Sequence, residues 1–445
     1  MYDPAIYLID KDFYEKYHYH VNVQSIVEQP NLYILAKFPS NDQQLMYTET
    51  RMEDIQTLKE PSLANGIPIK DKLRVFKGDA PAAQFEAGQQ KGGNYFCWSC
   101  PIKSTQSKDL VATLNATFLS FQDRVNKIME SVSSQDKLKN KCVKLYSNLD
   151  KIQIMDELRQ RNIKFIHSQP TKDLLIKLQN EMHGMQRLPA LMFNNPDLPL
   201  NQLQLDNYEI LNNEPLHDLS NHIKNLYQDL PRQFENPFKD DFLAIIDYSF
   251  NGKEAKNSSD YRESLVVITN WFQQNCKINN INLINTKSKK NIVYNILRTL
   301  TEIQEILYLP DDKRNLKAVL RLITITFLHG MLVTKFLDKG KFKLTTRKEY
   351  GVYYHSLMGH APVQFRIFSG RASNTEKEEA SFSFFERNTN LTSNHHPENI
   401  IINSIIRMQA RDALNEGDLY AKRESKINKS YINIKNQLQN TTIPF

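Results

Sequence analysis

The chain has 445 residues, of which 40% are hydrophobic and 24% are charged. This is the composition of an ordinary globular protein, so extensive disorder is excluded, and the length is sufficient for two or three domains with a sizeable core. The 57 basic and 50 acidic residues give a formal net charge of +7. An excess this small permits binding to nucleic acid but does not require it.

The cysteine content indicates a reducing compartment. Four cysteines are present: Cys97 and Cys100 are separated by two residues, whereas Cys142 and Cys276 stand alone. So few cysteines in so long a chain do not form a disulfide framework, and they point to metal ligands or buried thiols. Residues 1–17 carry charges throughout and lack the pattern of a signal peptide, and no run of eighteen apolar residues predicts a membrane span. We therefore expect a soluble intracellular protein.

The first 80 residues have the pattern of short strands. Three runs rich in β-branched and aromatic residues, bounded by Pro, Asn, Asp or Gly, occupy residues 17–23, 31–38 and 72–78. Between the second and the third run, residues 46–60 have the composition of a helix. The sequence therefore predicts a mixed, partly β-structured region at this end of the chain.

From about residue 104, apolar residues recur at spacings of three and four, which predicts amphipathic helices. The expected helices cover residues 108–132, 155–163, 172–185, 216–230, 261–276, 291–309 and 315–337. The proline-rich segment 187–200 is expected to be irregular, and the basic segment 285–291 to be an exposed loop. Beyond residue 349, a further helix is expected at 372–389, and the last 35 residues are expected to be peripheral.

Cys97 and Cys100 form a Cys-x-x-Cys pair, which is half of a tetrahedral zinc site, because the two-residue gap lets both thiolates face one ion from a tight turn. No second such pair is present, so histidine or a carboxylate has to complete the set. His355 and His360, in the segment HSLMGH, are the best partners. Weaker alternatives are Asp338, His395 and His396. The competing explanation is that the cysteines are buried thiols and the histidines are hydrogen-bonded core residues.

Acidic residues occur at two places that suit a divalent metal ion. Asp79 follows the strand expected at 72–78, where a carboxylate can project into a cleft and hold a magnesium ion. Turn formation by Gly78 and Asp79 explains the same residues without any metal. The second place is the start of the helix expected at 372–389, where carboxylates suit the helix dipole, although the small residues that follow permit one of them to face inward. These glutamates are Glu376, Glu378 and Glu379.

Three segments of the chain resemble the catalytic core of the V(D)J recombination-activating endonuclease and its relatives, the Transib transposases. They are FKGDAPAAQFEAGQQKGGNYFCWSC (76–100), NNEPLHDLSNHIKNLYQDLP (212–231) and YYHSLMGHAPVQFRIFSGRASNTEKEEASFSFFER (353–387). The shared order is a strand ending in Asp, a Cys-x-x-Cys turn, a long helical insertion, a His-x-x-x-x-His segment and a helix bearing Glu. The resemblance extends from about residue 45 to residue 390.

The resemblance implies an RNase H-like α/β (α+β) fold, in which a mixed sheet is interrupted by a long helical insertion that contains zinc. It implies a partial core with the Cys-x-x-Cys turn over residues 1–104, the insertion over 105–348, the His segment and the return of the catalytic helix over 349–395, and a peripheral helical tail over 396–445. In the family, the first catalytic aspartate lies on the first strand of the sheet. The chain is therefore expected to be truncated at its N-terminus, and the candidates for this residue are Asp3, Asp10 and Asp12.

The resemblance also implies a set of functional residues. In the family, two aspartates and one glutamate bind Mg²⁺ or Mn²⁺ and cut DNA. On the matching segments, Asp79 stands for the second aspartate and Glu379 for the glutamate, with Glu376 and Glu378 as alternates. A structural zinc ion would be held by Cys97, Cys100, His355 and His360.

Three further residues are singled out by the same segments. His217, in PLHDL, matches a family segment in which a histidine is also found, and a helix-packing role is favoured for it over chemistry. Arg366 and Arg371, between the His segment and the Glu helix, are candidates for contacts to DNA phosphates, although a solvated face explains them as well.

The sequence thus predicts a DDE-type DNA transposase or recombinase core that cleaves and joins DNA phosphodiesters with divalent metal ions. The expected partner is DNA, the expected assembly is a homodimer and the expected location is the nucleus, with no role for a membrane or a small-molecule substrate. The alternative is a catalytically inactive, zinc-stabilised DNA- or protein-binding protein derived from such an enzyme. A zinc hydrolase is disfavoured, because two thiolates and two imidazoles leave no open position on the ion.

Overall fold

The computed structural model describes residues 62–64, 67–69, 74–76, 78–89, 94–116, 119, 123, 124, 126, 149–185, 209–211, 214–250, 258–275, 288–310, 313–337, 350–366, 369, 370, 406 and 410. The chain divides into two compact units, and every described residue except Ile406 and Ala410 belongs to the first, which comprises Met1–Gln29 and Asn41–Glu376. The elements predicted at 17–23, 31–38, 46–60, 187–200 and 372–389 lie outside the described residues.

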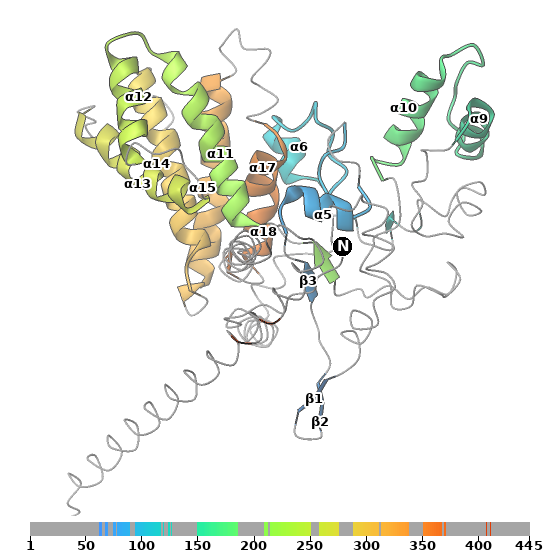
Figure 1. Ribbon diagram of the computed structural model, residues 1–445, viewed down its shortest axis with the longest axis horizontal. Helices are drawn as coiled ribbons and strands as arrows, with labels where there is room; N and C mark the ends of the chain where they lie inside the picture. Colours follow the sequence, from blue (N-terminus) through green and yellow to red (C-terminus); the bar gives the residue numbers. More distant parts are fainter. Residues whose placement is uncertain are drawn as a thin grey trace, which may run out of the picture. The chain divides into compact units, whose positions relative to one another are not determined.

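A bundle of long helices forms the main hydrophobic core (Figure 1). It contains α11 (Pro215–Asp229), α12 (Phe238–Ser249), α13 (Ser258–Asn275), α14 (Lys289–Leu307) and α15 (Leu316–Leu337). Along α14 the buried residues Ile292, Ile296, Leu300, Ile303 and Leu307 recur at spacings of three and four, and every residue from Ile292 to Leu297 is buried, so this part of the helix is enclosed on all sides. The burial of these apolar side chains, rather than any single contact, holds the bundle together.

Most of the predicted helices are confirmed. Those expected at 155–163, 172–185, 216–230, 261–276, 291–309 and 315–337 correspond to α9 (Lys151–Gln160), α10 (Thr171–Glu181), α11, α13, α14 and α15. The helix α12 was not predicted, and α14 begins at Lys289, inside the segment expected to be a loop. Within the helix expected at 108–132, α6 (Leu110–Leu114) ends at the cap residue Asn115, and the described residues Asp123, Arg124 and Asn126 are again helical.

The helices α9 and α10 pack against each other as a helical hairpin (Figure 1). Asp150 and Gln153 form a capping box at the start of α9, in which each side chain satisfies the backbone N–H of the other residue. Pro170 precedes α10. A capping box therefore marks the start of α9, and a proline marks the start of α10.

The remaining helical elements are short and surround the Cys and His motifs. They are α5 (Ala80–Glu86), α6, the 3₁₀ turn η2 (Pro231–Gln233), α17 (Val352–His355), the π-helical turn η4 (Ser356–His360) and α18 (Ala361–Gln364). The last three form one continuous helical stretch that packs against α11, α15 and α6. This stretch attaches the His-x-x-x-x-His segment to the bundle.

The predicted α/β fold class with an RNase H-like mixed sheet is wrong for the described residues, which form an all-α structure. The strands among them are β1 (Ser62–Ala64), β2 (Ile67–Ile69), β3 (Arg74–Phe76) and β4 (Glu209–Leu211). β1 pairs with β2 in antiparallel orientation, β3 pairs with β4 in parallel orientation, and neither pair is joined to a larger sheet in this part of the chain. Apolar residues at helical spacing therefore form the described core, and the strand expected at 72–78 is described over Arg74–Phe76.

The helix α15 is long and apolar enough to cross a membrane by length and composition, over Leu316–Phe336. Within the bundle, however, 44% of its most apolar window is buried, and Val319, Leu322 and Val333 are inaccessible or nearly so. Core helices of soluble proteins have the same length and composition, so these two properties do not assign α15 to a membrane.

Candidate metal centre

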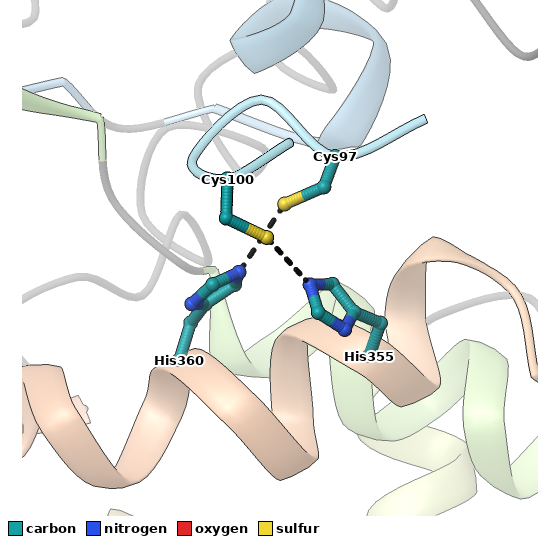
Figure 2. Close-up of side chains that lie close together, drawn as sticks. All are labelled: Cys97, Cys100, His355 and His360. Atoms are coloured by element: carbon teal, nitrogen blue, oxygen red, sulfur yellow. Dashed lines mark hydrogen bonds between the residues drawn. The ribbon is translucent and has the colours of Figure 1, made fainter. Parts of the chain in front are cut away.

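Cys97, Cys100, His355 and His360 converge on one point (Figure 2). The Sγ atom of Cys97 lies 3.2 Å from Nε2 of His360, and the Sγ atom of Cys100 lies 3.2 Å from Nε2 of His355. The four candidate ligand atoms all lie within 4.8 Å of one another, and all four residues are buried. Two motifs separated by more than 250 residues therefore form a single group of two sulfurs and two nitrogens.

The Cys-x-x-Cys turn is stabilised by its own backbone and by aromatic packing. The backbone N–H of Ser99 donates to Sγ of Cys97 at 3.3 Å, which orients the sulfur from within the turn. Trp98, between the two cysteines, is buried with Ala83 of α5. The edge-to-face contact of Phe96 with the His355 ring, 5.7 Å between ring centroids, adds a contact between the two motifs.

The π-helical turn explains how two histidines five residues apart reach one point. In an α-helix, residues five apart differ by about 140° around the axis, so His355 and His360 would not share a face. The turn η4 has the wider hydrogen-bond pattern, in which the backbone N–H of Ala361 donates to the carbonyl of Ser356. Five residues then complete about one turn, and both imidazoles project to the same side of the helix, as Figure 2 shows.

Two residues of the segment favour this local geometry. Pro362 has no backbone N–H and its ring would clash with the carbonyl of the residue four positions earlier, so a regular α-helix is interrupted here. Gly359 lies against α6: a Cβ atom at this position would be 3.0 Å from Cγ2 and 3.2 Å from the carbonyl oxygen of Thr113. A side chain at residue 359 would therefore push α6 away from the turn.

The electrostatics of the group suit metal binding. Burial opposes ionisation of the Cys97 thiol, but the hydrogen bond from Cys100 and the imidazoles of His360 and His355 outweigh it and hold the pKa of Cys97 well below its usual value. The same hydrogen bond and burial raise the pKa of Cys100. Burial lowers the pKa of His355, which keeps this imidazole in the neutral form that coordinates metal ions. Zinc binding needs both sulfurs as thiolates, so it would release the protons that the thiols carry.

The residues present fit a structural zinc ion. For zinc–sulfur bonds of about 2.3 Å and zinc–nitrogen bonds of about 2.0 Å at a tetrahedral angle, a sulfur and a nitrogen ligand lie roughly 3.5 Å apart. The two observed S···N distances of 3.2 Å are close to this value. Two thiolates and two imidazoles fill a tetrahedral shell and leave no position for a substrate or water, so the group is consistent with structural zinc rather than catalytic zinc.

A buried arginine, not identified from the sequence, supports the cysteine turn. Arg124 donates to the carbonyl of Trp98 and, at 3.1 Å, to Oε1 of Gln89. Burial lowers the pKa of Arg124 to about 10, and the nearby Cys97 and Cys100 oppose this shift. The guanidinium therefore stays charged at neutral pH beside the two sulfurs. No spacing or motif in the sequence distinguishes it from a solvent-exposed arginine.

Asp79 follows β3, as predicted, and directly precedes α5, which was not predicted; the residue is partly exposed. Its Oδ1 atom accepts a hydrogen bond of 2.9 Å from the backbone N–H of Ala82, so it caps the helix. The neighbouring strand β4 leads to Glu214, which caps α11 by accepting from the backbone N–H of His217 at 2.6 Å. The same carboxylate is 2.7 Å from Nδ1 of His217, which fixes the orientation of this ring.

The other predicted site residues are described only in part. Arg366 is partly buried, and its carbonyl accepts from the buried Arg314 at 2.9 Å. Arg314 also donates to the carbonyl of Phe365 at 3.0 Å, so it satisfies the C-terminal end of α18. The predicted or alternative site residues that lie outside the described residues are Asp3, Asp10, Asp12, Asp338, Arg371, Glu376, Glu378, Glu379, His395 and His396.

A second buried histidine group was also missed by the sequence analysis. His222 of α11 and His329 of α15 face each other with 2.9 Å between their Nε2 atoms, and Nδ1 of His329 lies 2.9 Å from the Thr299 hydroxyl. The Tyr354 ring packs against His222 at 5.5 Å. The side chain of Asn295 is fully buried, and neither of its amide atoms has a hydrogen-bond partner among the described residues. The two histidines are 107 residues apart, so only the packing of α11 against α15 reveals the pair.

No protein-family model matches the chain, and no curated protein matches it either. The geometry of the described residues and the resemblance of the three sequence segments therefore carry the functional argument.

Proposed function

We propose that the chain is the zinc-stabilised core of a DDE-type DNA transposase or recombinase. The observation that carries the proposal is the meeting of Cys97 and Cys100 with His355 and His360 in one buried group. The resemblance of the sequence segments implies this pairing of a Cys-x-x-Cys turn with a distant His-x-x-x-x-His segment. A pairing across 255 residues is a specific requirement, and the described structure meets it.

In this proposal the zinc ion has a structural role. It joins the cysteine turn that follows α5 to the helical stretch α17–α18, and so closes a loop of 255 residues between Cys100 and His355. Closing a long loop removes much conformational freedom from the unfolded chain, and a metal site can supply the free energy for it. Zinc would thereby fix the segment that bears Asp79 relative to the His segment.

The proposed reaction needs carboxylates that hold Mg²⁺ or Mn²⁺. When bound, such ions stabilise the attacking and leaving oxygens of a phosphodiester during an in-line displacement. Asp79, together with Glu379 or its alternates Glu376 and Glu378, would hold them. Of these carboxylates, Asp79 lies among the described residues, where its bond to Ala82 fixes the side chain at the end of β3.

The proposed partner is DNA, bound by a homodimer in the nucleus. Basic surface would meet the phosphates, and Arg366 and Arg371 are the first candidates for these contacts. Arg366 is partly exposed and lies two residues beyond the end of α18, so its position depends on the zinc-binding stretch.

A second candidate function is a catalytically inactive, zinc-stabilised binding protein. The observation in its favour is the capping bond of Asp79, which gives this residue a structural role that needs no metal. Such a protein has the same fold and the same zinc centre, but its carboxylates do not cooperate in DNA cleavage.

Nicking of supercoiled plasmid DNA in the presence of Mn²⁺ or Mg²⁺ distinguishes the two candidates. The proposal predicts nicking by the zinc-loaded chain that stops when EDTA removes the divalent ions. Asp79→Asn should nick at least about 100-fold more slowly, since a lost ligand to a catalytic ion removes several kcal/mol of transition-state stabilisation. Asparagine still caps the helix, so the melting temperature should be unchanged. Zinc-loaded chain that binds DNA without nicking it would favour the second candidate.

A further inference from the structure

A buried hydrogen bond connects the zinc-binding stretch to α11. Ser356 directly follows His355 and is the first residue of η4. Its hydroxyl donates to Oδ2 of Asp218 at 2.5 Å across a sequence separation of 138 residues. Ser356 is 0% exposed and Asp218 is 2% exposed, so water does not compete for this bond.

Burying an acidic residue at this position is energetically unfavourable. A buried carboxyl group loses its hydration and is tolerated only when hydrogen bonds replace the water. Burial raises the pKa of Asp218 well above its usual value, the bond from Ser356 opposes this shift, and the nearby Glu214 and Cys97 add to it. A hydrophobic residue of similar size would avoid the desolvation cost, so stability alone does not account for an aspartate here.

The hydrogen bond between Ser356 and Asp218 lies where it can fix the π-helical turn. His355 at the end of α17 and His360 at the end of η4 face the cysteines, and Ser356, the first residue of η4, is fixed to α11 by Asp218. At the other end of the stretch, Arg314 holds the carbonyls that end α18. A π-helical turn is uncommon and competes with regular α-helix, so its ends must be fixed if both imidazoles are to stay aimed at one ion.

We propose that Asp218 is a positioning residue of the zinc centre: by holding the Ser356 hydroxyl it aims the His355 imidazole, and zinc affinity depends on this bond. The inference goes beyond the proposed action on DNA. It rests on zinc binding alone, so its test needs no cleavage assay. Residues that orient metal ligands from outside the coordination shell typically change metal affinity by about 10- to 100-fold when they are removed.

The test compares zinc affinity, measured by competition with a chromophoric chelator, in three variants of the full chain. Ser356→Ala removes the donor and should weaken zinc binding about 10- to 100-fold. Asp218→Asn keeps an accepting oxygen and should stay within about threefold of the wild type, because the bond rather than the charge is required. Ser264→Ala is the matched control: Ser264 is also fully buried and bonds Tyr227 at 3.0 Å, but it lies in α13. It should lower the melting temperature without changing zinc affinity.

The proposal would be overturned by Ser356→Ala that binds zinc as tightly as the wild type, or by Ser264→Ala that weakens zinc binding equally. If Ser356→Ala does not fold, Asp218→Ala decides, because it removes the accepting oxygens from the other side of the bond, and wild-type zinc affinity in this variant contradicts a positioning role. Wild-type chain that takes up no zinc would also overturn it. Absence of DNA cleavage would not contradict the positioning role of Asp218, because the test measures zinc binding.

Discussion

Asp79 and Glu214 occupy equivalent places at the ends of two paired parallel strands. Phe76 of β3 pairs with Leu211 of β4, and each acidic residue follows its strand by three positions. Each then caps the helix that begins next to it, with bonds of 2.9 Å from Ala82 and 2.6 Å from His217. The matched positions place two helix N-termini, α5 and α11, at the same edge of the strand pair. The cysteine turn follows the first helix, and Asp218 lies in the second.

Because Asp79 caps α5, substitutions of this residue can separate its structural role from its proposed role in metal binding. Asp79→Ala should lower the free energy of unfolding by about 1 kcal/mol, because the N–H of Ala82 loses its partner. Asp79→Asn should leave the free energy of unfolding unchanged, since asparagine is an equally good cap. Denaturant unfolding of both variants provides the measurement. Equal destabilisation by the two substitutions would contradict a capping role.

Removal of one zinc ligand should destabilise the protein and abolish stoichiometric zinc. Cys97→Ala and His360→Ala each leave three ligands, and we expect the bound zinc to fall well below one per chain. The melting temperature should fall by at least about 5 °C, because the free energy of metal binding contributes directly to folding. Elemental analysis and thermal unfolding are the measurements. Cys142→Ala, which changes a cysteine outside this group, is the control and should bind zinc normally.

Gly359→Ala should disturb the contact between η4 and α6. The new Cβ would lie 3.0 Å from Cγ2 and 3.2 Å from the carbonyl oxygen of Thr113, so backbone as well as side chain must move. We expect a loss of about 1 to 3 kcal/mol in the free energy of unfolding, as for overpacking elsewhere in protein cores. The double variant Gly359→Ala, Thr113→Ser removes the methyl group and should recover part of the loss. Full stability of Gly359→Ala would show that α6 does not pack tightly on the turn.

The pair His222–His329 should make the helical bundle sensitive to acid. The Thr299 hydroxyl donates to the carbonyl of Asn295, so it accepts from Nδ1–H of His329, whose Nε2 then accepts from Nε2–H of His222. Burial and the adjacent ring lower the pKa of His222 well below its usual value, and burial lowers the pKa of His329 to about 3.

The direction of the pH effect follows from these pKa values. Between the folded value of about 3 and the unfolded value of about 6.5, the unfolded chain binds more protons, so stability is complete above pH 6.5 and is lost as the pH falls. His329 alone should contribute a loss of roughly 2 kcal/mol between pH 7 and pH 5. The measurement is the free energy of unfolding at both pH values in chelator, so that zinc release does not contribute. His329→Gln should show a smaller difference than the wild type, and an identical difference would exclude the pair as its source.

Most of the helices were predictable from the sequence because apolar residues recur in them at spacings of three and four, as in α14 from Ile292 to Leu307. The helix α12 was missed. The strands were less predictable, since short β-branched runs such as residues 72–78 carry no information about their partners. The pairing of β3 with β4 joins residues 135 positions apart, from Arg74 to Glu209, and no local pattern encodes it.

The four ligand residues of the zinc centre could be predicted from the sequence, whereas the buried residues around them could not. The spacing within Cys97/Cys100 and His355/His360 suggests ligands, and the resemblance supplies the pairing of the two motifs. The bond between Ser356 and Asp218 and the buried position of Arg124 depend on how the helices pack. Polar residues of these types are mostly exposed in proteins, so the sequence alone gives no reason to place them inside.

X-ray absorption spectroscopy at the zinc edge, on purified chain whose zinc content has been determined, tests the central claim most directly. The account predicts one zinc per chain with two sulfur and two nitrogen ligands, supplied by Cys97, Cys100, His355 and His360. The Cys97→Ala variant should lose this spectrum. Folded chain without zinc, or a zinc ion with water or carboxylate oxygen among its ligands, would contradict the account.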